Sequence, residues 1–327
     1  MHQTTAQSTQ SIVVGVDVGG TKILAALVDE HGSLLGRVYR PTDVRSPEVT
    51  LDCIAGTVEQ AIREGGCSVK QVRAVGLGIP GIIDPVRGIG VASVNLNWRD
   101  VPVKAALEAR LGLPCAIEND VKAAALGETR YGAGKGLESL VFMTIGTGIS
   151  AAIVLENRIY RGPTGMAGEI GHAVIDWDGP KCKCGGRGCF EALASGPAIA
   201  ALAARKLRSG RRSLLANVGD ALTAEDVFKA AVQGDGLALE TANEVGQYVA
   251  FAIQFIALAY EPSLVVLGGG VPQAGKPFLE PVQRSLDSLA RENWVFREVY
   301  RPGFLRVSEL GSDIGVLGAA ALVAPVQ

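Results

Sequence analysis

The apolar residues of the chain fall into two similar series of short strands separated by polar turns. The first series, IVVGVDVGGTKILAALVDEHGSLLG, reads as a strand, a glycine turn, a strand, a DEHG turn and a third strand. The second, LVFMTIGTGISAAIVLENRIYRG, repeats this order with a Gly–Thr–Gly turn and an ENR turn. The stretches GGTKILAALV and GTGISAAIVL are similar enough to indicate a duplicated unit.

Further elements follow each series. Apolar residues at helical spacing predict helices at 47–64, 101–112, 120–130, 195–208, 223–233 and 235–260. Short apolar runs closed by Gly, Pro or Asn predict strands at 72–78, 114–117 and 264–267. Because hairpins precede helices in both halves, we expect an α/β protein with two lobes, each built on a mixed sheet. We expect a disordered tail at 1–11, an N-terminal lobe at 12–120 and a C-terminal lobe at 121–311.

Composition narrows the class of protein. The chain has 327 residues, of which 48% are hydrophobic, so a large core is possible and disorder is excluded. The formal net charge of -2 argues against nucleic-acid binding, which needs clustered lysines and arginines. The first residues have no signal-peptide pattern, and the longest apolar stretch, Val249 to Tyr260, is too short to span a bilayer. We therefore expect a cytoplasmic protein with neither nucleic acid nor membrane as partner.

The first glycine turn has the character of a phosphate-binding loop. Asp17 ends the preceding strand, and the turn consists of Gly19, Gly20, Thr21 and Lys22. Adjacent glycines let backbone N–H groups approach a phosphate, while the threonine adds a hydroxyl donor and the lysine a charge. The turn leads into a strand instead of a helix, which excludes a Walker loop and a dinucleotide fingerprint. Taken alone, it could equally be a plain tight hairpin.

Two further glycine turns favour a nucleotide site. Gly146, Thr147 and Gly148 repeat the first turn in the second half, so the two turns could face each other and grip a polyphosphate. The glycines 268–270, with Gly269 at their centre, follow the strand LVVL, where a base or ribose could lie against bare backbone. Three such turns at strand ends favour a nucleotide site over coincidence.

Polar residues also end the strand before 120. Glu118, Asn119 and Asp120 follow an apolar run, at the place where open α/β sheets bind ligands. Asp120 could accept a proton from a substrate hydroxyl that attacks a phosphoryl group. The alternative is that Asp120 only caps the following helix, a common role for aspartate.

A cluster of cysteines gives the clearest chemical signal. One nitrogen and three sulfurs are available from His172, Cys182, Cys184 and Cys189, a closed tetrahedral set typical of structural zinc. A disulfide between two cysteines one residue apart would be strained, so a redox pair is a poor alternative. Glu169 and Glu191 flank these ligands, and rigidly held carboxylates can accept hydrogen bonds from sugar hydroxyls. The pattern therefore predicts that the ion orders a sugar-binding loop.

These motifs resemble the ROK family of bacterial sugar kinases and related repressors. The matching segments are GVDVGGTK, GIPG at 78–81, END at 118–120, GTG at 146–148, GEIGH at 168–172 and CKCGGRGCFE at 182–191. The resemblance implies the actin-like ATPase fold, with two ribonuclease-H-like lobes, a cleft between them, and the C-terminal helix 312–327 completing the first lobe. It also implies transfer of a phosphoryl group from Mg-ATP to the 6-hydroxyl of a hexose. Glucose is the first expectation, and an N-acyl hexosamine or fructose is the alternative.

The resemblance also implies roles for single residues. Asp120 would be the catalytic base, and the sugar contacts would be Gly81, Asn95, Asn119, Glu169, His172 and Glu191. Asp17 and the first glycine turn would meet the Mg-ATP phosphates, with Thr147 and Gly148 opposite. A homodimer or a dimer of dimers is the implied assembly.

Two features bear on the alternatives within the family. Relatives commonly continue GTG with more glycines, whereas this chain has Ile149, Ser150 and Ala151, which leaves ATP or polyphosphate open as donor. Repressors of the family carry a DNA-binding helix-turn-helix ahead of the first glycine turn, and here eleven residues precede Ile12. We therefore expect a kinase and not a regulator. A non-catalytic actin-like scaffold would have no use for the two glutamates and the cysteine cluster.

Overall fold

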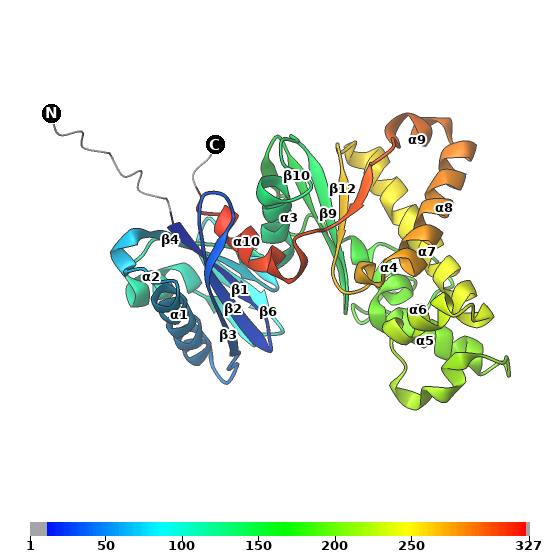
Figure 1. Cartoon of the computed structure of the whole chain (residues 1–327), viewed down its shortest axis with the longest axis horizontal. Helices are drawn as coiled ribbons and strands as arrows, with labels where there is room; N and C mark the ends of the chain where they lie inside the picture. The colour runs from blue at the N-terminus through cyan, green and yellow to red at the C-terminus, as the bar shows by residue number, and fades with distance from the viewer. Residues whose placement is uncertain (1–11, 325–327) are drawn as a thin grey trace. The chain divides into compact units, whose positions relative to one another are not determined.

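A computed structural model describes residues 12–324, which form two compact units (Figure 1). The first unit comprises 12–136, 162–166 and 309–324, and the second comprises 137–161 and 167–308. The predicted tail at 1–11 and the last three residues of the predicted C-terminal helix lie outside the described residues.

The first unit is built on a five-stranded mixed sheet. Its strands are β1 (Ile12–Val18), β2 (Lys22–Val28), β3 (Leu34–Pro41), β4 (Val72–Ile79) and β8 (Cys115–Asn119). The order is β3-β2-β1-β4-β8, with β1, β4 and β8 parallel and the first three strands an antiparallel meander. A second, three-stranded antiparallel sheet contains β5 (Ile82–Asp84), β6 (Ile89–Ser93) and β7 (Trp98–Val101). The patterns above did not predict this small sheet.

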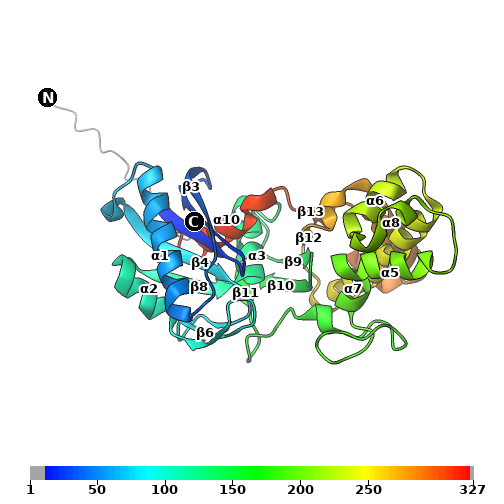
Figure 2. The same cartoon turned by 90° about the horizontal axis from the view of Figure 1, so that it is seen from below.

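Helices cover both faces of the five-stranded sheet (Figure 2). They are α1 (Pro47–Glu64), α2 (Val103–Leu111), α3 (Asp120–Tyr131) and α10 (Ile314–Ala321), with 3-10 turns η1 (Val69–Gln71) and η6 (Gly311–Asp313). Val14 and Val16 of β1 pack into the core with α1 and α2, whereas Val13 packs against α10, as strand alternation requires. Gly15 permits this close packing, because a Cβ there would lie 1.9 Å from the carbonyl oxygen of Val316.

The predicted lobe boundary at residue 120 is too early. The first unit continues to Gly136 because α3 packs against α10 and β4. The helix that begins at Asp120 therefore belongs to the first unit.

The second unit repeats the topology of the first. Its strands are β9 (Leu140–Ile145), β10 (Ile149–Leu155), β11 (Arg158–Tyr160), β12 (Val265–Gly268) and β13 (Leu305–Val307). The order β11-β10-β9-β12-β13 matches that of the first sheet strand for strand, with the same parallel and antiparallel pairs. This common topology confirms the duplication indicated by the sequence.

Most of the second unit is helical. The α-helices are α4 (Phe190–Ala194), α5 (Gly196–Leu207), α6 (Ala224–Val232), α7 (Gly236–Tyr260), α8 (Lys276–Glu292) and α9 (Trp294–Val299). The 3-10 turns are η2 (Ile170–His172), η3 (Leu214–Asn217), η4 (Gly219–Ala221) and η5 (Pro272–Ala274). The predicted helices at 195–208, 223–233 and 235–260 are confirmed, whereas α8 and α9 were not predicted. Within residues 12–324, none of the helices combines the length and apolar character needed to cross a membrane.

Candidate active site and metal centre

Two acidic residues lie at the carboxyl edge of the first sheet. Since β1, β4 and β8 are parallel, their carboxyl ends meet at one edge. Asp17 of β1 pairs with Gly78 of β4, which in turn pairs with Glu118 of β8. Asp120 begins α3 directly after β8, and a Cβ at Gly78 would lie 3.4 Å from its Cα. Asp17 and Asp120 therefore share this edge, on either side of a position that has no side chain.

The pKa of Asp17 reflects this arrangement. It is raised to about 6, first because burial removes water from the carboxylate and second because of the nearby charge of Asp120, while Lys22 lowers it. A cation at this edge would reduce the repulsion between the two carboxylates. Carboxylate oxygens are also the ligands that Mg²⁺ prefers, so these residues fit a magnesium ion.

Asn119, and not Asp120, is the N-cap of α3. Its Oδ1 accepts hydrogen bonds from the backbone N–H groups of Val121 and Lys122, both at 3.1 Å. Its Nδ2 donates to the carbonyl oxygen of Gly81 at 3.1 Å and to Oδ1 of Asp120 at 2.9 Å. Asp120 is therefore the first residue of α3 and not its N-cap, although its Oδ1 also accepts the N–H of Val121 at 2.9 Å. Asn119 fills that role and also orients the Asp120 carboxylate.

The first glycine turn is a tight hairpin that also accepts a hydrogen bond from a residue outside the turn. The N–H of Gly19 donates to the carbonyl oxygen of Lys22 at 2.7 Å, which closes the turn. The hydroxyl of Thr42 donates to the carbonyl oxygen of Gly19 at 2.6 Å. Thr21 and Lys22 are exposed, so their side chains can reach a ligand.

Two predicted sugar contacts of the first unit lie close to this turn. A Cβ at Gly20 would lie 2.9 Å from the carbonyl oxygen of Asn95, so Asn95 packs directly on the turn. Gly81 has φ +108, and a Cβ there would lie 2.3 Å from the carbonyl oxygen of Ala92 on β6. The segment between β6 and β7 of the small sheet thus brings Asn95 onto the first glycine turn, and Gly81 packs on β6 of the same sheet.

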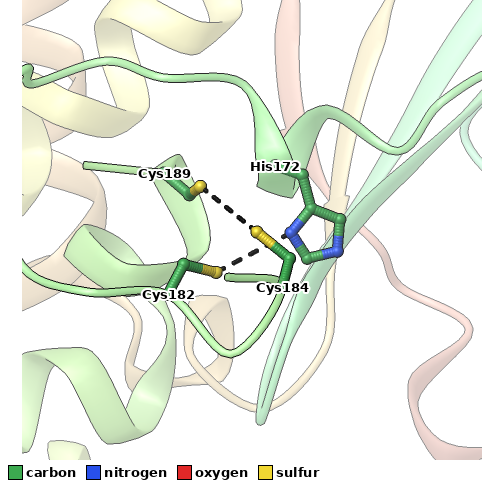
Figure 3. A group of neighbouring side chains, drawn as sticks. All are labelled: His172, Cys182, Cys184 and Cys189. Carbon is green, nitrogen blue, oxygen red and sulfur yellow. Dashed lines mark hydrogen bonds between the residues drawn. The ribbon is translucent and has the colours of Figure 1, made fainter. Parts of the chain in front are cut away.

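In the second unit, the four predicted metal ligands come together (Figure 3). Sγ of Cys182 lies 3.8 Å from Nδ1 of His172, and Sγ of Cys184 lies 3.7 Å from Sγ of Cys189. All four ligand atoms lie within 4.8 Å of one another. Around a tetrahedral zinc ion, two sulfurs would be about 3.8 Å apart and a sulfur and a nitrogen about 3.6 Å apart. The four residues therefore fit a closed structural zinc site.

The thiols of this cluster differ in their acidity. A hydrogen bond from the backbone of Gly186, followed by contacts with the neighbouring thiols, lowers the pKa of exposed Cys184. Burial, and then the neighbouring sulfurs, raise the pKa of Cys189 to about 12. Zinc binds thiolates, so occupation of the site would release the proton of Cys189.

The loop that carries Glu169 and His172 is pressed against β10. The carbonyl oxygen of Gly168 accepts a hydrogen bond from the N–H of Ala151 at 2.8 Å. A Cβ at Gly171 would lie only 2.1 Å from the carbonyl oxygen of Ile149. Both glycines of the GEIGH motif thus contact the strand, and half-buried Glu169 is held between them.

Glu191 contacts the second glycine turn. Its Oε2 accepts a hydrogen bond from the backbone N–H of Ile149 at 3.0 Å. The same oxygen would lie 2.7 Å from a Cβ at Gly148, so the glycine makes room for the carboxylate. The sequence predicted Glu191 as a sugar contact, and nothing in its spacing indicated this second contact.

A large cavity opens beside the same turn. Its volume is about 1040 Å³, and its lining includes Gly146, Thr147, Leu222, Phe228, Gly270 and Val271. Gly270 lines the cavity, whereas a Cβ at the predicted Gly269 would lie 2.5 Å from the carbonyl oxygen of Ile145. The side chain of Ile149 is only 3% exposed, so this departure from the family pattern does not cover the turn.

The fold and the site agree with the comparisons to known proteins. The chain belongs to the ROK family, which it matches over residues 13–325. It is 37% identical to a glucokinase of Halalkalibacterium halodurans, over 95% of this chain and 94% of the relative. A ROK family glucokinase from Streptomyces griseus, in complex with glucose and AMPPNP, is 34% identical with a TM-score of 0.76, covering 95% and 99% of the two chains. These matches confirm the predicted actin-like ATPase fold.

The family also contains regulators. The chain is 30% identical to the xylose repressor of Bacillus subtilis, over 95% of this chain and 76% of that protein. Family membership alone therefore does not decide between enzyme and regulator, and the chemistry of the site has to do so.

Proposed function

We propose that this protein transfers the γ-phosphoryl group of ATP to the 6-hydroxyl of glucose, giving glucose 6-phosphate and ADP. The observation that carries the proposal is the placement of Asp120, which Asn119 orients beside Asp17 at the carboxyl edge of the first sheet. Similarity to glucokinases, one of them in complex with glucose and AMPPNP, supports the same substrates.

In this proposal, Asp120 accepts the proton of the 6-hydroxyl while the sugar oxygen attacks the γ-phosphorus and ADP leaves. The hydrogen bond from Asn119 keeps the carboxylate oriented. Asp17 would hold Mg²⁺, which when bound neutralises charge on the phosphate oxygens. The N–H groups of Gly19 and Gly20, with the side chains of Thr21 and Lys22, would contact the phosphates. Positioning and charge stabilisation would supply most of the rate.

The family resemblance implies sugar contacts in each unit. Asn119, Gly81 and Asn95 belong to the first unit, and Glu169, His172 and Glu191 belong to the second. Nδ1 of His172 faces Cys182 and would bind zinc, which leaves Nε2 for a sugar oxygen. The zinc would be structural, because four protein ligands close its coordination shell.

The cavity of the second unit would hold the nucleoside of ATP. Its apolar wall, with Leu222, Phe228 and Val271, suits a purine ring, and Gly270 presents bare backbone. Gly146 and Thr147 line this cavity, and Gly148 lies next to Glu191. The turn that these three residues form would therefore meet the phosphates.

We further propose that the protein forms homodimers or dimers of dimers in the cytoplasm. Helix α7 exposes Phe251, Phe255 and Leu258, at 47%, 62% and 42%, and their spacing puts them on one face. A second copy of the chain would cover this face, and Phe255→Asp should then shift the assembly toward monomer in light scattering. An unchanged molar mass would reject α7 as the contact.

The cytoplasmic location rests on the thiol cluster, which suits a reducing compartment.

A coupled assay of ADP formation tests the proposed reaction. The panel contains glucose, fructose and N-acetylated hexosamines as acceptors, with ATP and polyphosphate as donors. We expect the highest kcat/KM with glucose and ATP. Preference for another hexose would correct the substrate and leave the reaction type intact. Sugar binding without turnover of any donor would reject the kinase and favour a regulator.

A further inference from the structure

We propose that Glu191 positions the second glycine turn, and that it does so as part of a segment fixed by the zinc site. The segment, residues 189–196, runs from the ligand Cys189 through helix α4 to the first residue of α5. We call it the bracketing segment, because its two ends contact the two sides of the turn 146–148. The consequence for nucleotide binding rests on the proposed function, whereas the positioning itself does not.

The first contact is made by the Glu191 side chain. Its Oε2 accepts the N–H of Ile149, the first residue of β10 after the turn, at 3.0 Å. Gly148 leaves space for this carboxylate, since a Cβ there would lie 2.7 Å from the same oxygen. The carboxylate therefore fixes the side of the turn that leads into β10.

The second contact comes from the other end of the bracketing segment. The N–H of Gly196 donates to the carbonyl oxygen of Gly146 at 2.7 Å, on the side of the turn that follows β9. Within the bracketing segment, Phe190 and Ala194 are fully buried in the core of the second unit. Helix α4 is thus a rigid spacer, and the turn is held on both sides by one short piece of chain.

The metal ligands stand at the start of this piece. Cys189 is the residue before α4, and the N–H of Phe190 donates to the carbonyl oxygen of Ala173, next to the ligand His172, at 2.9 Å. Gly171, on the other side of His172, packs on the carbonyl oxygen of Ile149. Gly171, next to one metal ligand, therefore packs on the carbonyl of Ile149, and Glu191, two residues after another ligand, accepts the N–H of Ile149.

Hydrogen exchange in the absence of ligands tests the positioning directly. The measurement follows the amide of Ile149, in peptides covering 146–155, for the metal-loaded protein and three variants. Glu191→Ala removes the acceptor and should speed exchange at Ile149 about tenfold or more. Glu191→Gln keeps an oxygen acceptor and should stay close to the parent. Glu169→Ala removes another predicted sugar contact, which lies outside the bracketing segment, and is the matched control, with no change expected.

Two further variants keep the test decisive if Glu191→Ala folds poorly. Gly148→Ala pushes the carboxylate away from the turn and should reproduce the faster exchange. Cys184→Ser, which weakens the metal site, should raise exchange in the same peptide. Unchanged exchange in both Glu191→Ala and Gly148→Ala would overturn the positioning role. Equal acceleration in Glu191→Gln and Glu191→Ala would overturn the acceptor role. Parent-like exchange in Cys184→Ser would remove the metal from the proposal.

Titration calorimetry with AMPPNP, without sugar, then measures the functional consequence. Glu191→Ala should bind the nucleotide about tenfold more weakly, which corresponds to about 1.4 kcal/mol. Glu191→Gln and Glu169→Ala should remain within a factor of about three of the parent. If Glu191→Ala loses no affinity, the turn does not need this support for nucleotide binding. If the parent protein itself binds no nucleotide, the proposed function fails, while the exchange result still decides the positioning.

Discussion

The two glycine turns occupy equivalent places in the two sheets, yet they carry different chemistry. Asp17, two residues before the first turn, pairs with Gly78 of β4. Thr144, two residues before the second turn, pairs with Gly268 of β12 in the same register. Where the first sheet has an acid, the second therefore has a hydroxyl. The residue that begins the following strand differs in the same way, being exposed Lys22 in one and buried Ile149 in the other.

The difference shows that two copies of one backbone topology can obtain their carboxylates from different parts of the chain. The ionisable groups at the edge of the first sheet belong to the sheet and its connections. Asp17 lies on strand β1, and Asp120 begins the helix that directly follows strand β8. The second sheet receives its carboxylate from Glu191, which lies outside the sheet and next to the metal ligands. Changes in the first unit should therefore affect the chemical step, and changes in the metal site should affect the geometry of the second turn.

The largest effect is expected from Asp120→Asn. The substitution removes the proposed base but keeps the shape of the side chain, so turnover should fall about 100- to 10,000-fold. Stability should change little, because the cap of α3 is Asn119. Steady-state kinetics and thermal melting measure the two effects separately.

Asp52→Asn is the matched control for this variant. It makes the same chemical change on α1, where the carboxylate is 68% exposed and pairs with Arg110. Turnover should stay at the parent level. Near-normal turnover in Asp120→Asn itself would show that the first sheet does not supply the base, and the contrast between the two units would fail.

A smaller effect on turnover, and a large one on the second unit, is expected from Cys184→Ser. Elemental analysis of the parent should find about one zinc per chain, and the variant should lose most of it. Because metal binding is linked to folding, the variant should also melt at a lower temperature. Glucose affinity should weaken about tenfold, since the loop with Glu169 and His172 would have to order on binding.

Cys53→Ser provides the comparison for the zinc experiment. Cys53 lies in α1 of the first unit, and its Sγ contacts the carbonyl oxygen of Pro41. This variant should keep its zinc and its melting temperature. A metal-free parent protein, or unchanged melting of Cys184→Ser, would reject structural zinc in the second unit.

The smallest effect on stability distinguishes Asp17 from its counterpart Thr144. The pKa of Asp17 is about 6 in the folded chain against an ordinary 3.8, so the folded state binds its proton more tightly than the unfolded state. Stability is then lost as the pH rises from about 4 to 6, and the full cost, about 1–3 kcal/mol, is present above pH 6. Asp17→Asn cannot ionise, so it should melt higher than the parent at pH 7.5 and by a clearly smaller margin at pH 4.5.

Thr144→Val tests the equivalent position of the second sheet. It has no ionisable group to remove, so its effect on melting should be the same at both pH values. If the gain in melting temperature of Asp17→Asn does not grow with pH, the ionised Asp17 carboxylate does not destabilise the folded state. Asp17→Asn should also have little kinase activity, because the proposed magnesium ligand is gone, whereas Thr144→Val removes no proposed ligand.

Much of the fold could be predicted because the duplicated series have strong local patterns. The order of strand, glycine turn and strand in the first half recurs in the second half, and both meanders formed as expected. Helix α7 was predicted within one residue, since its apolar periodicity is long and its N-cap, Asp235, is a standard signal.

Other elements were missed for identifiable reasons. In α8 the apolar residues Phe278, Val282 and Leu286 do repeat every four positions, but Pro281 lies inside the helix and reads as a breaker. Gly246 of α7 accommodates this proline, since a Cβ there would lie 2.6 Å from it. The small sheet β5–β7 has short strands with no clear alternation.

The metal ligands of the candidate site could be predicted from the sequence, whereas the hydrogen bonds that position its other residues could not. The metal residues are close in sequence, so spacing alone identifies them. The role of Asn119 as cap depended on where β8 ends, two residues later than predicted. The bond from Glu191 to Ile149 joins residues 42 positions apart and depends on a close approach at Gly148, which no local pattern encodes.

The packing of α10 against Gly15 has a consequence for how the protein is made. During synthesis on the ribosome, β1 emerges long before α10, the helix that covers one of its faces. The second unit, whose residues end at 308, is complete before then. Val13 and its neighbours therefore stay uncovered by this helix until α10 has been made. The part of the chain that is made first is the last to mature, and it is there that a chaperone would be needed most.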